Sequence, residues 1–337
     1  MTTSGLFKSE QALLDWFNNG PDGPERSAVR LEGIVKGGSV RRFYRLCDPA
    51  GESLGVLMEY SRGKEENNYY VAIASFLADL DVPVPQVLYH DPDLGLAWLQ
   101  DFGKQDLFFF KGSDWGKLKD YYTQVLQSIC PLWRNGVNHL ESFADLPMMK
   151  GFDSQLYTWE RNYFFDQCVS RFSDVDSDVD RRALHEECSP LQEVLLQEPA
   201  SLVHRDFQSH NIMMRKDGPG FIDFQGMRQG SWFYDLASLI YDPYMDLSES
   251  QRSSLVETTH QMMDWKLGMD AFEELLDAAA IQRLMQALGA YGYLGESLGK
   301  REFLDYIPVA RRTLLPIAER RGLECLKRLL ADVSISI

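Results

Sequence analysis

The chain has 337 residues, of which 45% are hydrophobic and 25% charged, so it has the composition of a globular protein and the length for two domains. It carries 50 acidic and 34 basic residues, a formal net charge of −16. Such a surface argues against nucleic acid or an anionic membrane as a partner. The five scattered cysteines include no Cys-x-x-Cys pair, which argues against a disulfide framework and a zinc site.

The N-terminal segment and the hydropathy pattern show no signal for export or membrane insertion. Residues 1–17 lack the basic start and the long apolar run of a signal peptide. No uninterrupted apolar stretch has the length of a membrane span. We therefore expect a cytoplasmic protein.

The first third of the chain predicts a small lobe that is rich in antiparallel strands. A short amphipathic helix over 9–18 is followed by a stretch of Gly, Pro and Asn that ends it. Strand-like runs then alternate with turn signals, and apolar residues at helical spacing predict one helix over 65–80. The expected strands cover residues 28–35, 40–47, 53–60, 83–91 and 94–101.

From residue 114 onward the pattern is mostly helical. The expected helices cover residues 114–134, 153–172, 178–198, 248–267, 271–294 and 321–332. Between them, residues 201–223 contain short apolar runs around tight turns, which predict short strands that carry a loop. The chain is therefore predicted to be α+β, with a β-rich N-terminal lobe over 1–101 and a mainly helical lobe over 102–337.

Two motifs in the second lobe suit phosphoryl transfer. Residues 204–206 read His-Arg-Asp, Asn211 follows, and residues 222–225 read Ile-Asp-Phe-Gln. Asp and Asn are common in turns, but their order between short strands matches the catalytic loop and the metal-binding turn of kinases. In that pattern the first Asp accepts the proton of the acceptor hydroxyl, while the Asn and the second Asp bind Mg²⁺. The motifs therefore predict Asp206 as the catalytic base, and Asn211 and Asp223 as metal ligands.

Longer stretches of the sequence resemble one branch of the kinase-like proteins. HRDF at 204–207, DFQ at 223–225 and YDLASL at 234–239 resemble motifs of the aminoglycoside phosphotransferase / choline kinase-like family. Within it, the chain is most similar to the bacterial N-acetylmuramate/N-acetylglucosamine anomeric kinases of cell-wall recycling. Further similar stretches lie at 39–46, 82–88 and 282–308. The resemblance implies a protein-kinase-like bilobal fold and the use of ATP and Mg²⁺.

The resemblance also implies roles for residues around the catalytic positions. His204 and Asp235 would support the catalytic loop through hydrogen bonds. The turn at Gly37, Gly38 and Ser39 would cover the nucleotide phosphates, although an ordinary hairpin turn is the alternative. Gln100 and Asp101 lie where the adenine-contacting hinge is expected.

The sequence departs from the kinase pattern at the phosphate-binding lysine. The strand expected to carry it has Met58 at that position, and Ala72 stands where a pairing Glu is expected. Arg42 is the candidate substitute, because it closely follows the glycine turn and a guanidinium binds phosphate through a fork of donors. Arg42 would then face the nucleotide and Phe43 the core of the lobe. A solvated Arg42 is the alternative.

These observations predict an ATP- and Mg²⁺-dependent phosphotransferase that acts on the hydroxyl of a small molecule. The preferred acceptor is an amino sugar, phosphorylated at its anomeric hydroxyl, bound between the catalytic loop and the helical segment 145–200. Two alternatives stay open. One is an aminoglycoside or choline-like kinase, which an acidic cleft would favour; the other is a nucleotide-binding pseudokinase, which the missing lysine would explain. The oligomeric state is open as well.

Overall fold

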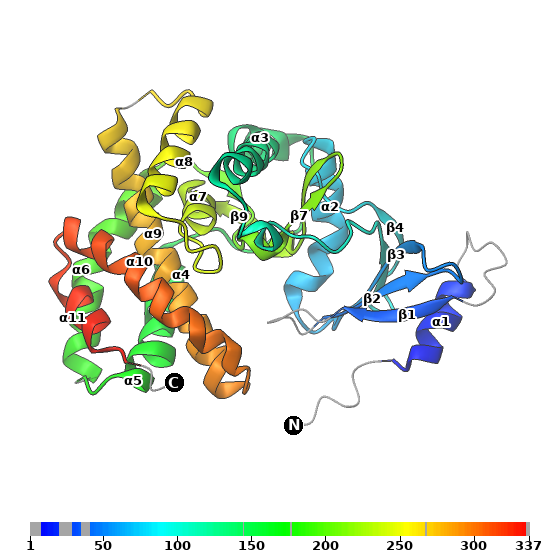
Figure 1. The fold of residues 1–337 in the computed structure, drawn as a ribbon, viewed down its shortest axis with the longest axis horizontal. Coiled ribbons are helices and arrows are strands. Elements are labelled where there is room, and N and C mark those ends of the chain that lie inside the picture. The colour runs from blue at the N-terminus through cyan, green and yellow to red at the C-terminus, as the bar shows by residue number, and fades with distance from the viewer. Residues whose placement is uncertain are drawn as a thin grey trace.

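The structure, a computed structural model, describes residues 8–19, 29–34, 41–143, 145–175, 177–266 and 268–334. The chain forms a smaller lobe built on a sheet and a larger lobe of helices (Figure 1). The sheet is antiparallel, with strand order β1-β2-β3-β5-β4. Its strands are β1 (Arg30–Ile34), β2 (Arg42–Cys47), β3 (Ser53–Glu59), β4 (Val87–Asp91) and β5 (Leu96–Leu99).

A helix packs against each face of this sheet, because side chains alternate between the faces along every strand. On one face, Leu46 and Leu57 pack against Leu13 and Phe17 of α1 (Glu10–Asn18). On the other, Met58 joins the cluster of apolar side chains from α2 (Tyr70–Asp79). The expected helix over 65–80 thus begins as the 3₁₀ helix η1 (Glu65–Tyr69) and continues as α2.

The larger lobe is organised around α9, which is buried along most of its length and contacts the helices around it (Figure 1). Its long helices are α3 (Trp115–His139), α4 (Ser154–Phe164), α6 (Ser177–Gln197), α7 (Phe233–Ile240), α8 (Glu249–Met262), α9 (Met269–Gly292), α10 (Ile307–Arg320) and α11 (Glu324–Asp332). Short helical segments are η2 (Phe108–Phe110), η3 (Leu140–Ser142), the π-helical η4 (Phe165–Val169), α5 (Ser170–Phe172), the π-helical η7 (Tyr293–Ser297) and η8 (Arg301–Tyr306). None of the helices in the described ranges combines the length and apolarity needed to cross a bilayer.

Two small antiparallel ladders carry the loops of the predicted motifs. β6 (Ser201–Val203) pairs with β9 (Arg228–Gly230), and β7 (Ile212–Arg215) pairs with β8 (Gly218–Phe221). The short helices η5 (Ser209–Asn211) and η6 (Phe224–Gly226) lie between these strands. The predicted α+β class and the short strands around a loop are therefore confirmed.

Candidate active site

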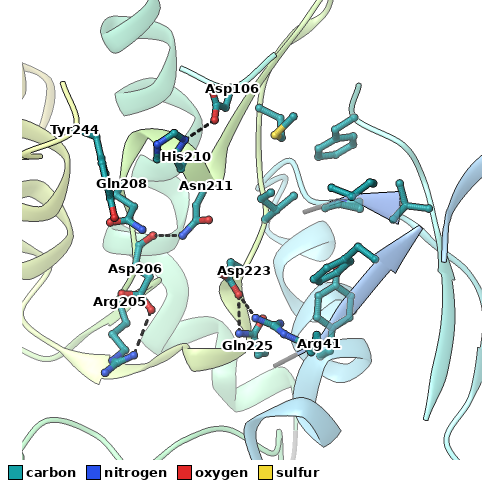
Figure 2. Close-up of a pocket in the computed structure, with 18 of the residues that line it drawn as sticks. Arg41, Asp106, Arg205, Asp206, Gln208, His210, Asn211, Asp223, Gln225 and Tyr244 are labelled. Carbon is teal, nitrogen blue, oxygen red and sulfur yellow. Dashed lines mark hydrogen bonds and ion pairs between the residues drawn. The ribbon is translucent and has the colours of Figure 1, made fainter. Parts of the chain in front are cut away.

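A cavity of about 790 Å³ lies between the two lobes, and both contribute its walls (Figure 2). The small lobe supplies β2, β3 and the segment that follows β5, while the large lobe supplies the loop after β6, the turn after β8, α9 and η8. This volume falls within the usual range for small-molecule sites.

Asp206, Asn211 and Asp223 all line this cavity (Figure 2). The amide nitrogen of Asn211 donates to the backbone oxygen of Asp206 at 2.9 Å. The backbone N–H of Ile222 donates to the backbone oxygen of Asn211 at 3.0 Å. These two bonds hold the His-Arg-Asp loop against the turn that carries Asp223, so the structure brings the three predicted residues together.

Asp235 of α7 holds the backbone of the loop before Asp206. Its carboxylate accepts the backbone N–H groups of His204 at 2.7 Å and Arg205 at 2.8 Å, and the indole N–H of Trp133 at 3.1 Å. Arg205 has a φ of 78°, a left-handed conformation that needs such support. Burial raises the pKa of Asp235 to about 7, and its N–H donors act in the opposite direction.

The side chain of His204 joins the two loops. Its Nε2 lies 3.1 Å from the backbone oxygen of Ile222, directly before Asp223. His204 is 2% exposed. Both His204 and Asp235 thus make the kind of contact that fixes a loop, and Asp235 does not line the cavity.

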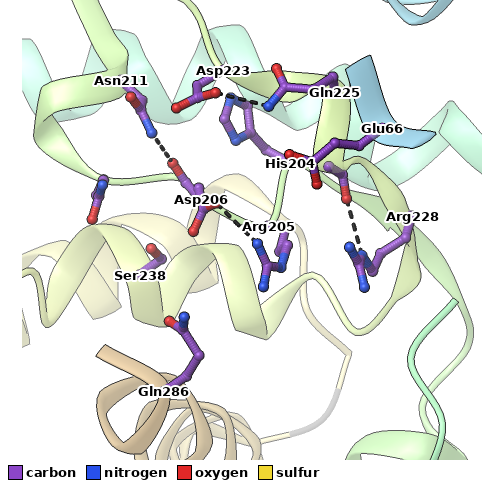
Figure 3. A network of polar contacts seen from close by, with 12 residues as sticks. Glu66, His204, Arg205, Asp206, Asn211, Asp223, Gln225, Arg228, Ser238 and Gln286 are labelled. Atoms are coloured by element: carbon purple, nitrogen blue, oxygen red, sulfur yellow. Dashed lines mark hydrogen bonds and ion pairs between the residues drawn. The ribbon is translucent and has the colours of Figure 1, made fainter. Parts of the chain in front are cut away.

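Two guanidiniums flank the carboxylate of Asp206. Figure 3 shows the contact with Arg205. An Arg205 nitrogen lies 3.2 Å from one carboxylate oxygen, and an Arg283 nitrogen lies 3.8 Å from the other. Burial pushes the pKa of Asp206 upward, but the charges of Arg205 and Arg283 outweigh it, so this pKa is lowered. Asp206 therefore stays ionised at neutral pH.

Glu160 of α4 lies behind these arginines and is fully buried. It accepts a hydrogen bond from the Tyr234 hydroxyl at 2.8 Å and another from the Gln282 amide at 3.2 Å. Burial raises the pKa of Glu160, and the charge of Arg205 opposes that rise. The sequence motifs miss Glu160 and Arg283, because only the packing of α4 and α9 brings Arg283 near Asp206 and Glu160 near Arg205.

Gln100 and Asp101 line the cavity on the small-lobe side. The backbone N–H of Gln100 donates to the Gln86 backbone oxygen at 2.8 Å. The Asp101 carboxylate accepts hydrogen bonds from two nitrogens of Arg45, at 2.5 and 3.1 Å. Burial raises the pKa of Asp101, but the hydrogen bonds from Arg45 and Ser53 outweigh it and lower this pKa. Asp101 is thus engaged in bracing this wall.

The side chains of β2 point to the opposite faces of the sheet from those predicted. Arg42 points to the face that α1 covers, where it forms an ion pair with Glu59 at 2.6 Å, and it does not line the cavity. Its neighbours Arg41 and Phe43 line the cavity instead, and Arg41 forms an ion pair with Asp223 (Figure 2). Tyr44 and Leu46 share the face of Arg42 and pack against α1, which fixes the strand in this orientation. The predicted phosphate-covering residues Gly37, Gly38 and Ser39 lie outside the described residues.

The sequence motifs do not reveal a second pair of side chains in the cavity. The Nδ1 atom of His210 lies 2.7 Å from a carboxylate oxygen of Asp106 (Figure 2). The His210 ring also packs against Phe108 and Tyr244, with centroids 4.4 and 4.7 Å away. His210 directly precedes Asn211 in the sequence, and that adjacency is the signal that could have revealed it.

The far wall of the cavity comes from α9 and η8 rather than from the segment 145–200. Arg283, Gln286 and Tyr291 of α9 line it, as do Phe303 and Tyr306 of η8. No residue of 145–200 that the structure describes lines the cavity, because α4 packs on α9 behind it. The lining of this cavity therefore gives no support to an acceptor position beside that segment.

Asn211 and Asp223 both line the cavity and offer an amide oxygen and a carboxylate that could bind a metal ion. Within the described ranges, no group of three or more His, Cys, Asp or Glu side chains could hold one alone. Mg²⁺ in phosphate-transfer sites takes one or two carboxylates and completes its shell with phosphate oxygens and water. One carboxylate and one amide oxygen beside an open cavity fit that requirement.

Comparison with known proteins places this arrangement in a family. Residues 30–275 match the model of the phosphotransferase enzyme family. The N-acetylmuramate/N-acetylglucosamine kinase of Pseudomonas aeruginosa is 25% identical over 308 residues, which cover 88% of this chain and 86% of that protein.

Solved structures match in fold. A choline/ethanolamine kinase family protein from Mesorhizobium loti superposes with a TM-score of 0.63 at 16% identity, covering 94% of this chain and 99% of that one. The GDP complex of an aminoglycoside 2′-phosphotransferase variant gives a TM-score of 0.63 at 14% identity, covering 95% and 100%. The resemblance and the protein-kinase-like fold are thus confirmed. The chain belongs to the phosphotransferase enzyme family and is a small-molecule kinase.

Proposed function

We propose that this protein transfers the γ-phosphate of ATP, with Mg²⁺, to a hydroxyl of an amino sugar, the anomeric hydroxyl being the preferred position. The observation that carries this proposal is the convergence of Asp206, Asn211 and Asp223 on one cavity between the lobes. The similarity to the N-acetylmuramate/N-acetylglucosamine kinase of Pseudomonas aeruginosa supports the choice of acceptor.

Each of the three residues has a distinct role in this proposal. Asp206, kept ionised by Arg205 and Arg283, accepts the proton of the attacking hydroxyl and orients it. Asn211 and Asp223 offer oxygen ligands to Mg²⁺, which supplies charge neutralisation at the phosphates. Asn211 donates its amide N–H to the loop backbone, so its amide oxygen is the atom that would bind the cation.

The proposal places the nucleotide along the small lobe and the acceptor against α9. Gln100 and Asp101 lie at the small-lobe side of the cavity, where the base would bind. Asp223 contacts Arg41 of the small lobe, whereas Asp206 contacts Arg283 of α9. A phosphate between Asp223 and Asp206 would then have the acceptor hydroxyl on its α9 side.

The charges beside α9 favour a neutral or anionic acceptor over a cationic one. Of the described acidic residues that line this part of the cavity, Asp206 lies between two guanidiniums and Asp106 pairs with His210, while Glu302 is exposed to solvent. Kinases of cationic acceptors need negative charge there, so these side chains argue against an aminoglycoside or choline as substrate.

Aromatic rings beside α9 would pack against the apolar face of a sugar. Tyr244 lies 4.6 Å from Tyr306 and 5.8 Å from Tyr291 between ring centroids, and Tyr291 lies 6.3 Å from Phe303. Such rings can also hold a quaternary ammonium group. The guanidiniums of Arg205 and Arg283 repel a cation at this place, which leaves the sugar as the better fit.

The acceptor is tested by measuring kcat/KM with Mg·ATP for four compounds: N-acetylglucosamine, N-acetylmuramate, an aminoglycoside and choline. We expect the two amino sugars to exceed the two cations by about tenfold or more, the factor that one unfavourable charge contact of about 1.4 kcal/mol produces. A preference for the aminoglycoside or for choline would contradict the proposed acceptor while leaving phosphoryl transfer intact.

A further inference from the structure

In kinases a lysine on a strand of the small lobe usually supplies positive charge at the nucleotide phosphates, and this chain has no lysine at that position. Met58, at the position of the missing lysine, is 1% exposed and packs in the apolar core. Arg42, on the same sheet, pairs with Glu59 on the face turned away from the cavity. A triphosphate carries more negative charge than Mg²⁺ neutralises, so phosphoryl-transfer sites add a protein cation.

Of the described lining residues from the small lobe and the segment that directly follows it, the basic ones are Arg41, Arg45, Lys64 and Lys104. Arg45 is held by Asp101 through two nitrogens on the same wall. The side chains of Lys64 and Lys104 are 53% and 70% exposed, so water screens them strongly. Arg41 differs from these three because its side chain is 7% exposed and it pairs with Asp223.

The surroundings of Arg41 strengthen its interaction with anions. Its guanidinium carbon lies 5.7 Å from the centroid of the Phe43 ring. Burial raises the pKa of Tyr70, so its neutral hydroxyl adds no charge beside the pair. Gln225 donates to the same Asp223 oxygen as Arg41, at 2.9 Å. Water is largely displaced from this place, so Arg41 attracts a negative group more strongly than an exposed lysine does.

We propose that Arg41 is the phosphate-binding cation of this kinase, and that its ion pair with Asp223 is the nucleotide-free arrangement of the site. Arg41 and a divalent cation would satisfy the same carboxylate, so they compete for it. When Asp223 is taken by Mg²⁺, Arg41 is released and its charge turns to the nucleotide phosphates. The inference rests on the proposed use of Mg·ATP.

The chain offers a matched control, because Arg41 and Arg42 are adjacent and point to opposite faces of the sheet. Arg41→Gln and Arg42→Gln remove the same charge and keep a hydrogen-bonding side chain of similar length. For each variant, the dissociation constant is measured for ATP with Mg²⁺, for adenosine and for Mn²⁺ alone. Mn²⁺ binding is followed by its electron paramagnetic resonance signal. The acceptor is absent throughout, so an incorrect acceptor would not change the outcome.

We expect Arg41→Gln to weaken Mg·ATP binding by about tenfold or more, the loss of one charge-assisted hydrogen-bonding group, and Arg42→Gln to leave it unchanged. Adenosine has no phosphate, so it should bind both variants as it binds the wild type, which also shows that the cavity has folded. Mn²⁺ alone should bind Arg41→Gln more tightly, because its competitor for Asp223 is gone.

A loss that is equal for adenosine and ATP would contradict the proposal. So would weaker Mn²⁺ binding to Arg41→Gln, or unchanged ATP binding to it together with a loss in Lys64→Gln. Arg41→Lys provides a second reading: it keeps the charge but not the fork, so it should recover part of the lost ATP affinity.

Discussion

The two guanidiniums around Asp206 determine the pH range in which it can act as a base. Because Arg205 and Arg283 lower the pKa of this carboxyl, protonation should reduce kcat only at a pH below the usual range for an aspartate. Arg283→Gln removes one of these charges, so the pKa of Asp206 should rise and the acidic fall of kcat should move to higher pH. A profile of kcat that extends to acidic pH, below the usual pKa of an aspartate, measures this shift.

Arg312→Gln is the matched control for that profile. Arg312 pairs with Asp246 at 2.8 Å on the surface of the large lobe and does not line the cavity. Its loss should leave the pH profile unchanged. If Arg283→Gln lowers kcat equally at every pH, Arg283 holds the acceptor or the fold and does not set the charge of Asp206.

At the residue scale, the sequence predicts the acid and amide side chains better than the basic ones. Asp206, Asn211 and Asp223 lie in one short segment with a recognisable order, so a linear motif reveals them. Arg41 and Arg283 come from distant segments, and only the packing of the two lobes brings them to the same cavity. A linear pattern carries no information about such an approach.

At the element scale, the facing of β2 depends on a helix that the sequence reveals only in part. The expected helix over 9–18 matches α1, but its docking on the sheet decides which face of β2 remains for the nucleotide. Tyr44 and Leu46 are apolar and lie on the face of Arg42, and this pattern is the signal that could have corrected the prediction.

Two further elements show the limits of periodicity. The sequence pattern does not predict α10, because Pro308 and Pro316 are usually read as helix breakers; Pro308 lies in its first turn, where proline is tolerated. β9 is too short for a strand pattern and is defined by its pairing with β6. The long helices α3, α6, α8 and α9 lie where apolar spacing predicts them.

The close packing of α9 against the segment after α4 gives an element-scale prediction. A Cβ atom on Gly292 would lie 1.9 Å from the backbone oxygen of Gln167, a contact that flexible side chains cannot relieve. Gly292→Ala should therefore lower the free energy of unfolding by about 1–3 kcal/mol, the usual cost of overpacking. Urea denaturation measures this loss.

Gly112→Ala is the control for that substitution. Gly112 lies in an exposed turn before α3, and nothing lies within 4 Å of a Cβ placed there. Its replacement should change the free energy of unfolding by no more than about 0.5 kcal/mol, as surface substitutions usually do. An equally small effect at Gly292 would mean that α9 and the segment after α4 separate without cost.

At the scale of the whole molecule, both lobes hold the turn that carries Asp223. Tyr70 of α2 packs on Phe224 with centroids 4.6 Å apart, and the Phe221 N–H donates to the Pro83 backbone oxygen at 2.7 Å. The chain has a formal net charge of −16, which repels an anionic nucleotide at long range. The cations inside the cavity must therefore attract it locally, and no sequence-level count of charges reveals this arrangement.

In the proposed function, Asp206 acts as the base for phosphoryl transfer in the cavity between the lobes. This role is tested by comparing the turnover of wild type and Asp206→Asn, using the amino sugar with the highest kcat/KM, while the dissociation constant for Mg·ATP is measured in parallel. We expect kcat to fall by about 10²–10⁴-fold, the usual contribution of a positioned acid or base, with nucleotide affinity retained. A variant that turns over at the wild-type rate would contradict this role.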